Sequence, residues 1–179
     1  MRKVLYILGQ LSDDDVEWLS RAGKRLRPPP GTVLIKQGTK IDAMYVLLDG
    51  RVSVSLDKIG EVAVLNTGEI VGEMSLVDAR PPSATVTTIG SCVLLEITRQ
   101  AIEEKLAKDV PFAARFYRAI ATFLSDRLRG TVQRLGYGGE GGLDENVELD
   151  GELDLNVLDN IHLAGARFER MLKKMMGGE

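Results

Sequence analysis

The sequence of 179 residues contains a single cysteine and a single histidine. One cysteine cannot form a disulfide within the chain, and Cys92 lies in the apolar run 92–95, where a small core residue is expected rather than a nucleophile. His162 has no potential metal ligands or acid–base partners arranged around it in the sequence. A Walker-type glycine loop is also missing. We therefore expect a protein that is not an enzyme and that carries no metal or cofactor.

The sequence also lacks an excess of positive charge and any long apolar run. Its net charge is −3 at pH 7, whereas nucleic-acid-binding domains are usually basic. No run approaches the roughly 18 apolar residues that a membrane span requires. Arg2 and Lys3 precede the apolar stretch 4–8, which is too short for a signal peptide and has no cleavage site after it. We expect a cytoplasmic protein that binds neither DNA nor membranes.

Hydrophobic residues make up 44% of the chain, which is enough for a sizeable core. Between residues 24 and 97 they occur in short runs separated by glycine turns. Val52, Val54 and Leu56 alternate with polar residues, which is typical of a strand with one solvent-facing side. About seven or eight strands with frequent turns predict an all-β roll or barrel over residues 24–97. The predicted strands include residues 32–35, 43–48, 52–56, 62–65, 69–71, 84–89 and 92–97.

Helical patterns flank this β region on both sides. Residues 1–23 are expected to contain an N-terminal helix that is capped by the Ser12 hydroxyl and ends at Gly23. Thr98 can cap a helix over residues 99–108, and a longer helix follows up to residue 136. Its apolar residues recur every four positions: Phe112, Phe116, Ile120, Leu124 and Leu128. This stripe can dock on the chain's own β-roll or pair with a second copy, so residues 112–135 are the predicted dimer helix.

The C-terminal part of the sequence differs from the rest in composition. Residues 137–154 form a predicted glycine-rich, acidic linker, and eight acidic residues but no Lys or Arg occur between positions 140 and 160. Residues 155–176 predict an amphipathic helix, because apolar side chains recur at three-four spacing. This tail can bind another protein or dock on its own domain. It is too short and too acidic for a helix-turn-helix domain.

Residues 72–86 carry the most specific pattern. They run from a strand end through a tight turn at Gly72, a short helical turn and a proline loop into a new strand. The segment resembles the phosphate-binding cassette of the cyclic nucleotide-binding domain family, which includes the catabolite activator protein and the regulatory subunits of cAMP-dependent protein kinase. The turn glycines at positions 31, 38, 50, 68 and 72 also match the family pattern, and the resemblance covers residues 8–135. It implies a mainly β fold, a jelly-roll-like double-stranded β-helix, with flanking helices and a long C-terminal helix that borders the ligand and pairs in a dimer.

The resemblance implies a ligand site for cAMP or cGMP. Backbone N–H groups after Gly72 are expected to bind the phosphate, and Glu73 is expected to accept a hydrogen bond from the ribose 2′-hydroxyl. The predicted site residues are Val64, Val71, Gly72, Glu73, Met74, Ser75, Arg80, Pro82, Ser83 and Ala84. In the family, an arginine that pairs with the phosphate occupies the position of Pro82. Proline has neither charge nor N–H donor, so the replacement cation has three candidates: Arg80, Arg127 and Arg129.

The sequence therefore predicts a cyclic nucleotide-binding regulatory or sensor module that acts through rearrangement of its helices. The alternative is a scaffold of the same fold that no longer binds nucleotide and interacts with an unidentified protein through its C-terminal tail. The first hypothesis predicts a homodimer and a cyclic nucleotide as the ligand.

Overall fold

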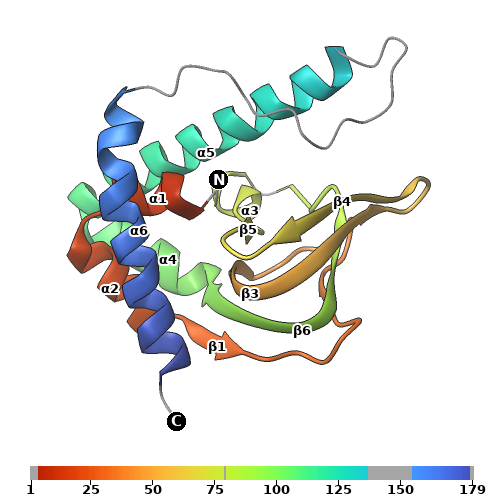
Figure 1. Cartoon of the computed structure of the whole chain (residues 1–179), viewed down its shortest axis with the longest axis horizontal. Coiled ribbons are helices and arrows are strands. Elements are labelled where there is room, and N and C mark those ends of the chain that lie inside the picture. The colour runs from red at the N-terminus through yellow and green to blue at the C-terminus, as the bar shows by residue number, and fades with distance from the viewer. Residues whose placement is uncertain (1–3, 79, 137–154, 178–179) are drawn as a thin grey trace.

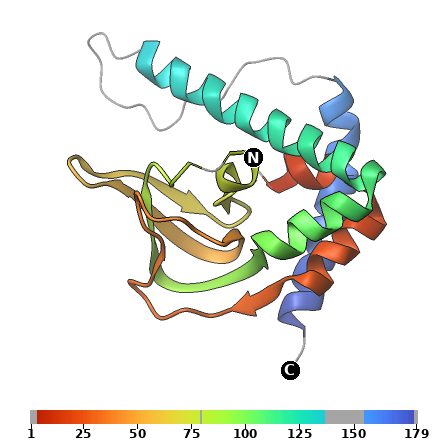
Figure 2. The ribbon, with the colours of Figure 1, turned by 180° about the vertical axis from the view of Figure 1, so that it is seen from behind.

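The structure, a computed structural model, describes residues 4–78, 80–136 and 155–177. It consists of a β-roll with helices gathered along one side, and the view from behind shows the same division (Figures 1 and 2). The predicted linker 137–154 and the residues before position 4 lie outside the described residues. The predicted fold class, mainly antiparallel β-sheet with flanking helices, is confirmed, although the sheet does not close into a barrel.

The β-roll is built on two long antiparallel strands. The strands of the described residues are β1 Lys24–Leu26, β2 Val33–Ile35, β3 Ala43–Leu56, β4 Gly60–Asn66, β5 Ile70–Val71 and β6 Thr85–Thr98. Along β3 and β6, Ala43 pairs with Thr98 and Ser55 pairs with Thr85. Strands β1 and β5 pair with one half of this ladder, and β2 and β4 pair with the other half.

The expectation of seven or eight strands is wrong. The sequence pattern divides each of two long strands at a glycine, but in the structure both strands continue through that glycine. Gly50 lies inside β3 with φ of 94°, and Gly90 lies inside β6 with φ of 65°. A Cβ atom on Gly50 would lie 2.4 Å from the carbonyl oxygen of Ser91. Glycine is thus required at position 50 for both its conformation and its contact with β6. The described part of the roll has six strands, two of which pass through both of its halves.

Alternation along β3 and β6 divides the apolar side chains between two cores. Leu47 and Leu94 point into the roll, whereas their neighbours Leu48 and Leu95 point to the helices. The inner core of buried residues consists of Ile35, Leu47, Val52, Val71, Val86, Cys92 and Leu94. The larger outer core joins β3 and β6 to the helical layer.

The helical layer draws on both ends of the chain. The helices are α1 Val4–Gln10, α2 Asp13–Ala22, α3 Met74–Val77, α4 Arg99–Lys108, α5 Val110–Gly136 and α6 Leu155–Met176. The predicted caps are present: Ser12 and Asp15 form a capping box, Thr98 caps α4, and the Gly23 N–H donates to the Leu19 carbonyl. The N-terminal region holds two helices where one was expected. None of the helices in the described ranges has both the length and the apolar character needed to cross a bilayer.

The C-terminal helix α6 docks on the N-terminal helices α1 and α2. Its side chains Ala164, Phe168 and Met171 are buried in the outer core. Arg167 donates from Nε to Asp13 Oδ1 at 2.6 Å and from Nη1 to the Leu8 carbonyl at 2.9 Å. Of the two arrangements that the sequence allowed for this helix, the structure shows docking on its own domain.

Candidate functional site

Gly72 brings the start of α3 against the first strand residues of β3. Its φ is 86°, a conformation that other residues rarely adopt. A Cβ atom at this position would lie 2.8 Å from the Ala43 carbonyl oxygen and 2.9 Å from Ile41 Cδ1. Both the turn and the close backbone approach therefore need glycine at position 72. The consequence is a fixed position for the short helix α3 at the surface of the roll.

The helical turn that follows leaves backbone donors at its start. The Leu76 N–H donates to the Glu73 carbonyl at 3.1 Å, which closes the turn. The amides of Met74 and Ser75 stand in the first turn, where a helix supplies no carbonyl for them. The Ser75 hydroxyl is buried and donates to the Gly72 carbonyl at 2.6 Å, so it stabilises the turn. Met74 is half exposed beside these amides.

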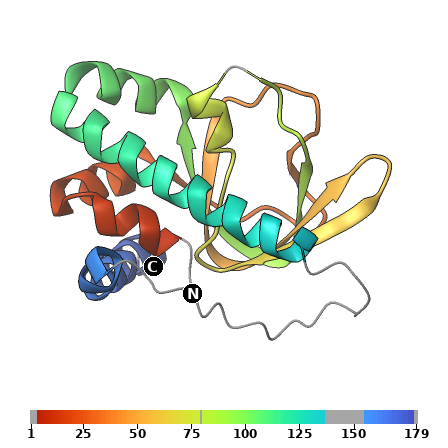
Figure 3. The ribbon, with the colours of Figure 1, turned by 90° about the horizontal axis from the view of Figure 1, so that it is seen from above.

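Glu73 is the most enclosed side chain of the predicted site. Only 1% of its side chain is exposed, and its Oε1 accepts a hydrogen bond from Nη1 of Arg127 at 2.6 Å. Burial raises the pKa of Glu73, and the positive charge of Arg127 opposes this effect only in part. The carboxylate is thus paired with the long helix α5, which runs across the roll beside α3 in the view from above (Figure 3).

Arg127 itself is held by three groups of different chemistry. Besides the Glu73 carboxylate, its Nη2 donates to the Ile70 carbonyl at 3.4 Å. Its guanidinium carbon lies 4.9 Å from the centre of the Phe123 ring, one helical turn earlier on α5. The side chain is 30% exposed, so the cation stands at the border between the protein and solvent.

The proline loop supplies less positive charge to the site than the cassette of the cyclic nucleotide-binding domain family, which has an arginine at the position of Pro82. Arg80 is 89% exposed on its side chain, and its Nε lies 3.9 Å from the Asp78 carboxylate. The carbonyl of Pro82 accepts a hydrogen bond from the Gly38 N–H at 2.9 Å, which ties the loop to a turn before β3. Ser83 is exposed and Ala84 is half-buried at the entry to β6.

The two predicted valines lie in different environments. Val71 is buried in the inner core, next to Gly72 in the sequence. Val64 is 40% exposed on β4, and its neighbour Leu65 is the residue that packs on the inner core. A role for either valine in contacting a sugar or base stays a prediction.

The structure adds Arg127 to the predicted site. The sequence indicated this residue only as one of three candidates for a replacement cation, and it did not indicate its pairing with Glu73. The two residues are 54 positions apart, and no spacing rule connects a short turn in a β-roll with a later helix. Arg129, the other candidate on α5, is exposed.

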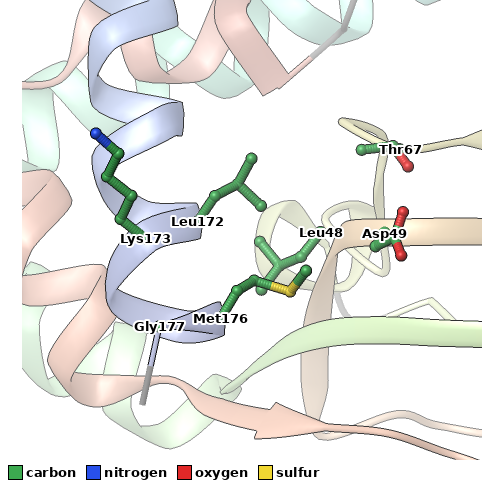
Figure 4. A pocket seen from close by; sticks show the side chains of 7 residues that line it. All are labelled: Leu48, Asp49, Thr67, Leu172, Lys173, Met176 and Gly177. Atoms are coloured by element: carbon green, nitrogen blue, oxygen red, sulfur yellow. The ribbon is translucent and has the colours of Figure 1, made fainter. Parts of the chain in front are cut away.

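A cavity of about 550 Å³ lies elsewhere, between the last turn of α6 and the roll. Leu48, Leu172 and Met176 form its apolar floor, and Thr67, Asp49 and Lys173 stand at its edge, with the Lys173 ammonium directed away from Asp49 (Figure 4). It includes no cassette residue and has no cluster of donors for an anion. Within the described ranges, no group of three or more His, Cys, Asp and Glu side chains could hold a metal ion.

Comparison with known proteins identifies similarity over the β-roll and the helix that follows it. Residues 25–109 match the family model described as cyclic nucleotide-binding domain. Among curated proteins, the cGMP-dependent protein kinase of Eimeria tenella is 39% identical over 77 residues, 43% of this chain and 8% of that protein. The cAMP-dependent protein kinase regulatory subunit of Dictyostelium discoideum is 34% identical over 77 residues, 39% of this chain and 24% of that protein. The chain thus spans a quarter or less of these relatives.

Similarity to solved structures extends further along the chain. A cyclic nucleotide-binding domain from Methylobacillus flagellatus KT has a TM-score of 0.68 and 24% identity, and the match covers 79% of this chain and 85% of that one. At this identity the likeness supports the fold, including parts of the helical layer beyond residues 25–109.

Proposed function

Because residues 25–109 belong to the cyclic nucleotide-binding domain family, we propose that the chain is a regulatory module that binds cAMP or cGMP at residues 72–86. The module is not an enzyme in this proposal. It acts in the cytoplasm, where the thiol of Cys92, its only cysteine, stays reduced. Binding changes the position of α5, and through it the activity of whatever the module controls.

The proposal depends most on the buried Glu73 carboxylate beneath α5. A ribose 2′-hydroxyl is a donor that this carboxylate can accept, and the amides at the start of α3 are donors for a phosphate. Glu73 already accepts a hydrogen bond from Arg127, so a ligand that donates to Glu73 or accepts from Arg127 alters the attachment of α5. Such control requires that the ligand bind one position of α5 more tightly than another.

Calorimetric titration of cAMP and cGMP into the purified protein tests this function. We expect binding, and we expect Glu73→Ala to weaken it by roughly tenfold to a hundredfold, the range for a charge-assisted hydrogen bond. Asp57→Ala, an acid-to-alanine change at the exposed turn after β3, serves as the control and should leave affinity unchanged. The absence of any heat or thermal shift up to millimolar ligand would reject nucleotide binding.

A scaffold without nucleotide binding is the competing function, and Pro82 is the observation that favours it. The loss of the cassette arginine removes the usual cationic partner of the phosphate. The version in which the tail recruits a partner is less favoured, because the apolar residues Ala164, Phe168 and Met171 of α6 are buried against the chain's own helices. The titration above separates these two functions.

We also propose that the module forms a homodimer through the second half of α5. Leu128 is 64% exposed and Val132 is 57% exposed, although both continue the apolar stripe whose first residues, Phe112 and Phe116, are fully buried. When an apolar stripe is buried in one half of a helix and exposed in the other half, the exposed half favours contact with another protein chain.

A further inference from the structure

Residues 72–86 have a deficit of positive charge at the place where a phosphate is expected. Pro82 stands where the family has an arginine, and its backbone provides an acceptor that already binds the Gly38 N–H. Arg80, the nearest cation in the loop, has a side chain that is 89% exposed and stands beside Asp78. Neither residue supplies a cation held against α3.

Arg127 is a cation held against the cassette from outside it. Its Nη1 lies 2.6 Å from Glu73 Oε1, which places the guanidinium at the first residue of the α3 turn. The Ile70 carbonyl and the Phe123 ring restrain the side chain from two further directions. A guanidinium has five N–H donors, so it can keep a contact with Glu73 or Ile70 and still offer donors to an anion.

We propose that Arg127 replaces the missing cassette arginine and binds the ligand phosphate, so that the site is completed by α5 instead of by the proline loop. This inference rests on the proposed function. Glu73 then contacts the ribose hydroxyl, and Arg127 turns part of its donor set from Glu73 to the phosphate. Because the cation belongs to α5, the negative charge of the ligand acts directly on the helix whose position is to be controlled.

If Arg127 binds the phosphate, its replacement should weaken binding only of ligands that carry a phosphate. If its ion pair with Glu73 is purely structural, its replacement should affect nucleotide and nucleoside equally. Arg127→Gln should weaken binding of the preferred cyclic nucleotide by roughly tenfold to a hundredfold. Binding of the corresponding nucleoside, adenosine or guanosine, should change much less, because the nucleoside lacks the phosphate. Arg127→Lys keeps the charge without the planar fork and should give an intermediate affinity. Arg129→Gln is the matched control on the same helix and should have no effect.

A rescue experiment tests the same inference from the other side. Adding Pro82→Arg to Arg127→Gln restores a guanidinium to the loop and should recover most of the lost affinity. Circular dichroism and thermal unfolding of each variant show whether it is folded. Equal weakening of nucleotide and nucleoside by Arg127→Gln, or unchanged nucleotide binding, would overturn the role of Arg127 while leaving the proposed function intact. Absence of nucleotide binding in the wild-type protein would overturn both.

Discussion

Two buried carboxylates, Asp15 and Glu73, each contact one arginine but have opposite pKa shifts. Burial opposes ionisation of both. Asp15 accepts two hydrogen bonds from Arg115, at 2.6 and 3.0 Å, and a third from the Ser12 N–H at 2.8 Å, which together outweigh burial and lower its pKa. For Glu73, burial outweighs the charge of Arg127 and a hydrogen bond from the residue's own backbone N–H, so its pKa is raised. Asp15 is therefore a structural anion, whereas Glu73 retains capacity for another donor.

Replacing Asp15 with asparagine is expected to reduce the free energy of unfolding by about 1.5 kcal/mol near neutral pH, because Arg115 loses its charged partner while its 36% exposed side chain is still hydrated in part. The folded-state pKa of Asp15 is lowered, so its stabilising contribution is present above the unfolded pKa and is lost as the pH falls through the folded pKa. The difference between wild type and variant should thus shrink below about pH 4. Urea unfolding between neutral and acidic pH measures it.

The exposed neighbour Asp14 provides the control for this measurement. Asp14→Asn removes the same charge from the same helical turn, and it should change stability by no more than about 0.5 kcal/mol. The assigned role of Asp15 would be wrong if the difference in free energy of unfolding between wild type and Asp15→Asn grew at acidic pH. It would also be wrong if Asp14→Asn lowered the free energy of unfolding by as much as Asp15→Asn.

At the residue scale, the sequence predicted the locally determined part of the site. The tight turn at Gly72, where φ is positive, was predicted from a glycine pattern within a few positions, whereas the burial of Glu73 was not predicted. The pairing of Glu73 with Arg127 depends on where α5 crosses the roll. That crossing follows from packing of the outer core and not from any local propensity, so the sequence left Arg127 as one candidate among three.

At the scale of elements, helix ends were easier to predict than strand ends. The caps at Ser12 and Thr98 involve residues three positions away and can be recognised in the sequence. Gly50 and Gly90 are read as turns by the same local rules, yet in the structure cross-strand pairing carries β3 and β6 through them. The short helix α1 lacks a cap signal and is stabilised by packing on α5 and α6, so sequence analysis missed it.

The attachment of α6 to the N-terminal helices can be tested at one buried side chain. Arg167 is 9% exposed on its side chain and joins α6 to Asp13 and to the Leu8 carbonyl. Arg167→Ala is expected to reduce the free energy of unfolding by about 1.5–3 kcal/mol, the range for hydrogen bonds to charged groups. Hydrogen exchange should show faster exchange in α6 first. The control is Arg170→Ala, whose parent side chain is 64% exposed and 3.4 Å from the same Asp13.

The Arg170→Ala variant should remain within about 0.5 kcal/mol of wild type. Equal losses in both variants would mean that general charge, and not the buried contact, attaches α6. Unchanged exchange in α6 after Arg167→Ala would show that its apolar face alone holds it in place.

At the scale of the whole molecule, the two ends of the chain meet in one layer. Arg25 of β1 donates to the Met175 carbonyl of α6, and α6 packs along α1, so the helical layer connects the roll with both termini of the described chain. The first half of α5 is buried in this layer, while its second half is anchored to the cassette by Arg127. When the part of α5 at the cassette moves, the rest of the same helix remains packed against α1 and α4.

The exposed half of α5 predicts the oligomeric state. Pairing would bury Leu128 of both copies, with a gain of about 1.5–3 kcal/mol for each fully buried leucine. We expect the wild-type protein to sediment as a dimer at micromolar concentration and Leu128→Glu to sediment as a monomer, because a buried unpaired charge opposes association. Ile59→Glu, at a position that is 72% exposed in the β3–β4 turn, is the control and should remain a dimer. A monomeric wild type, or a Leu128→Glu variant that still dimerises, would place the interface elsewhere or remove it.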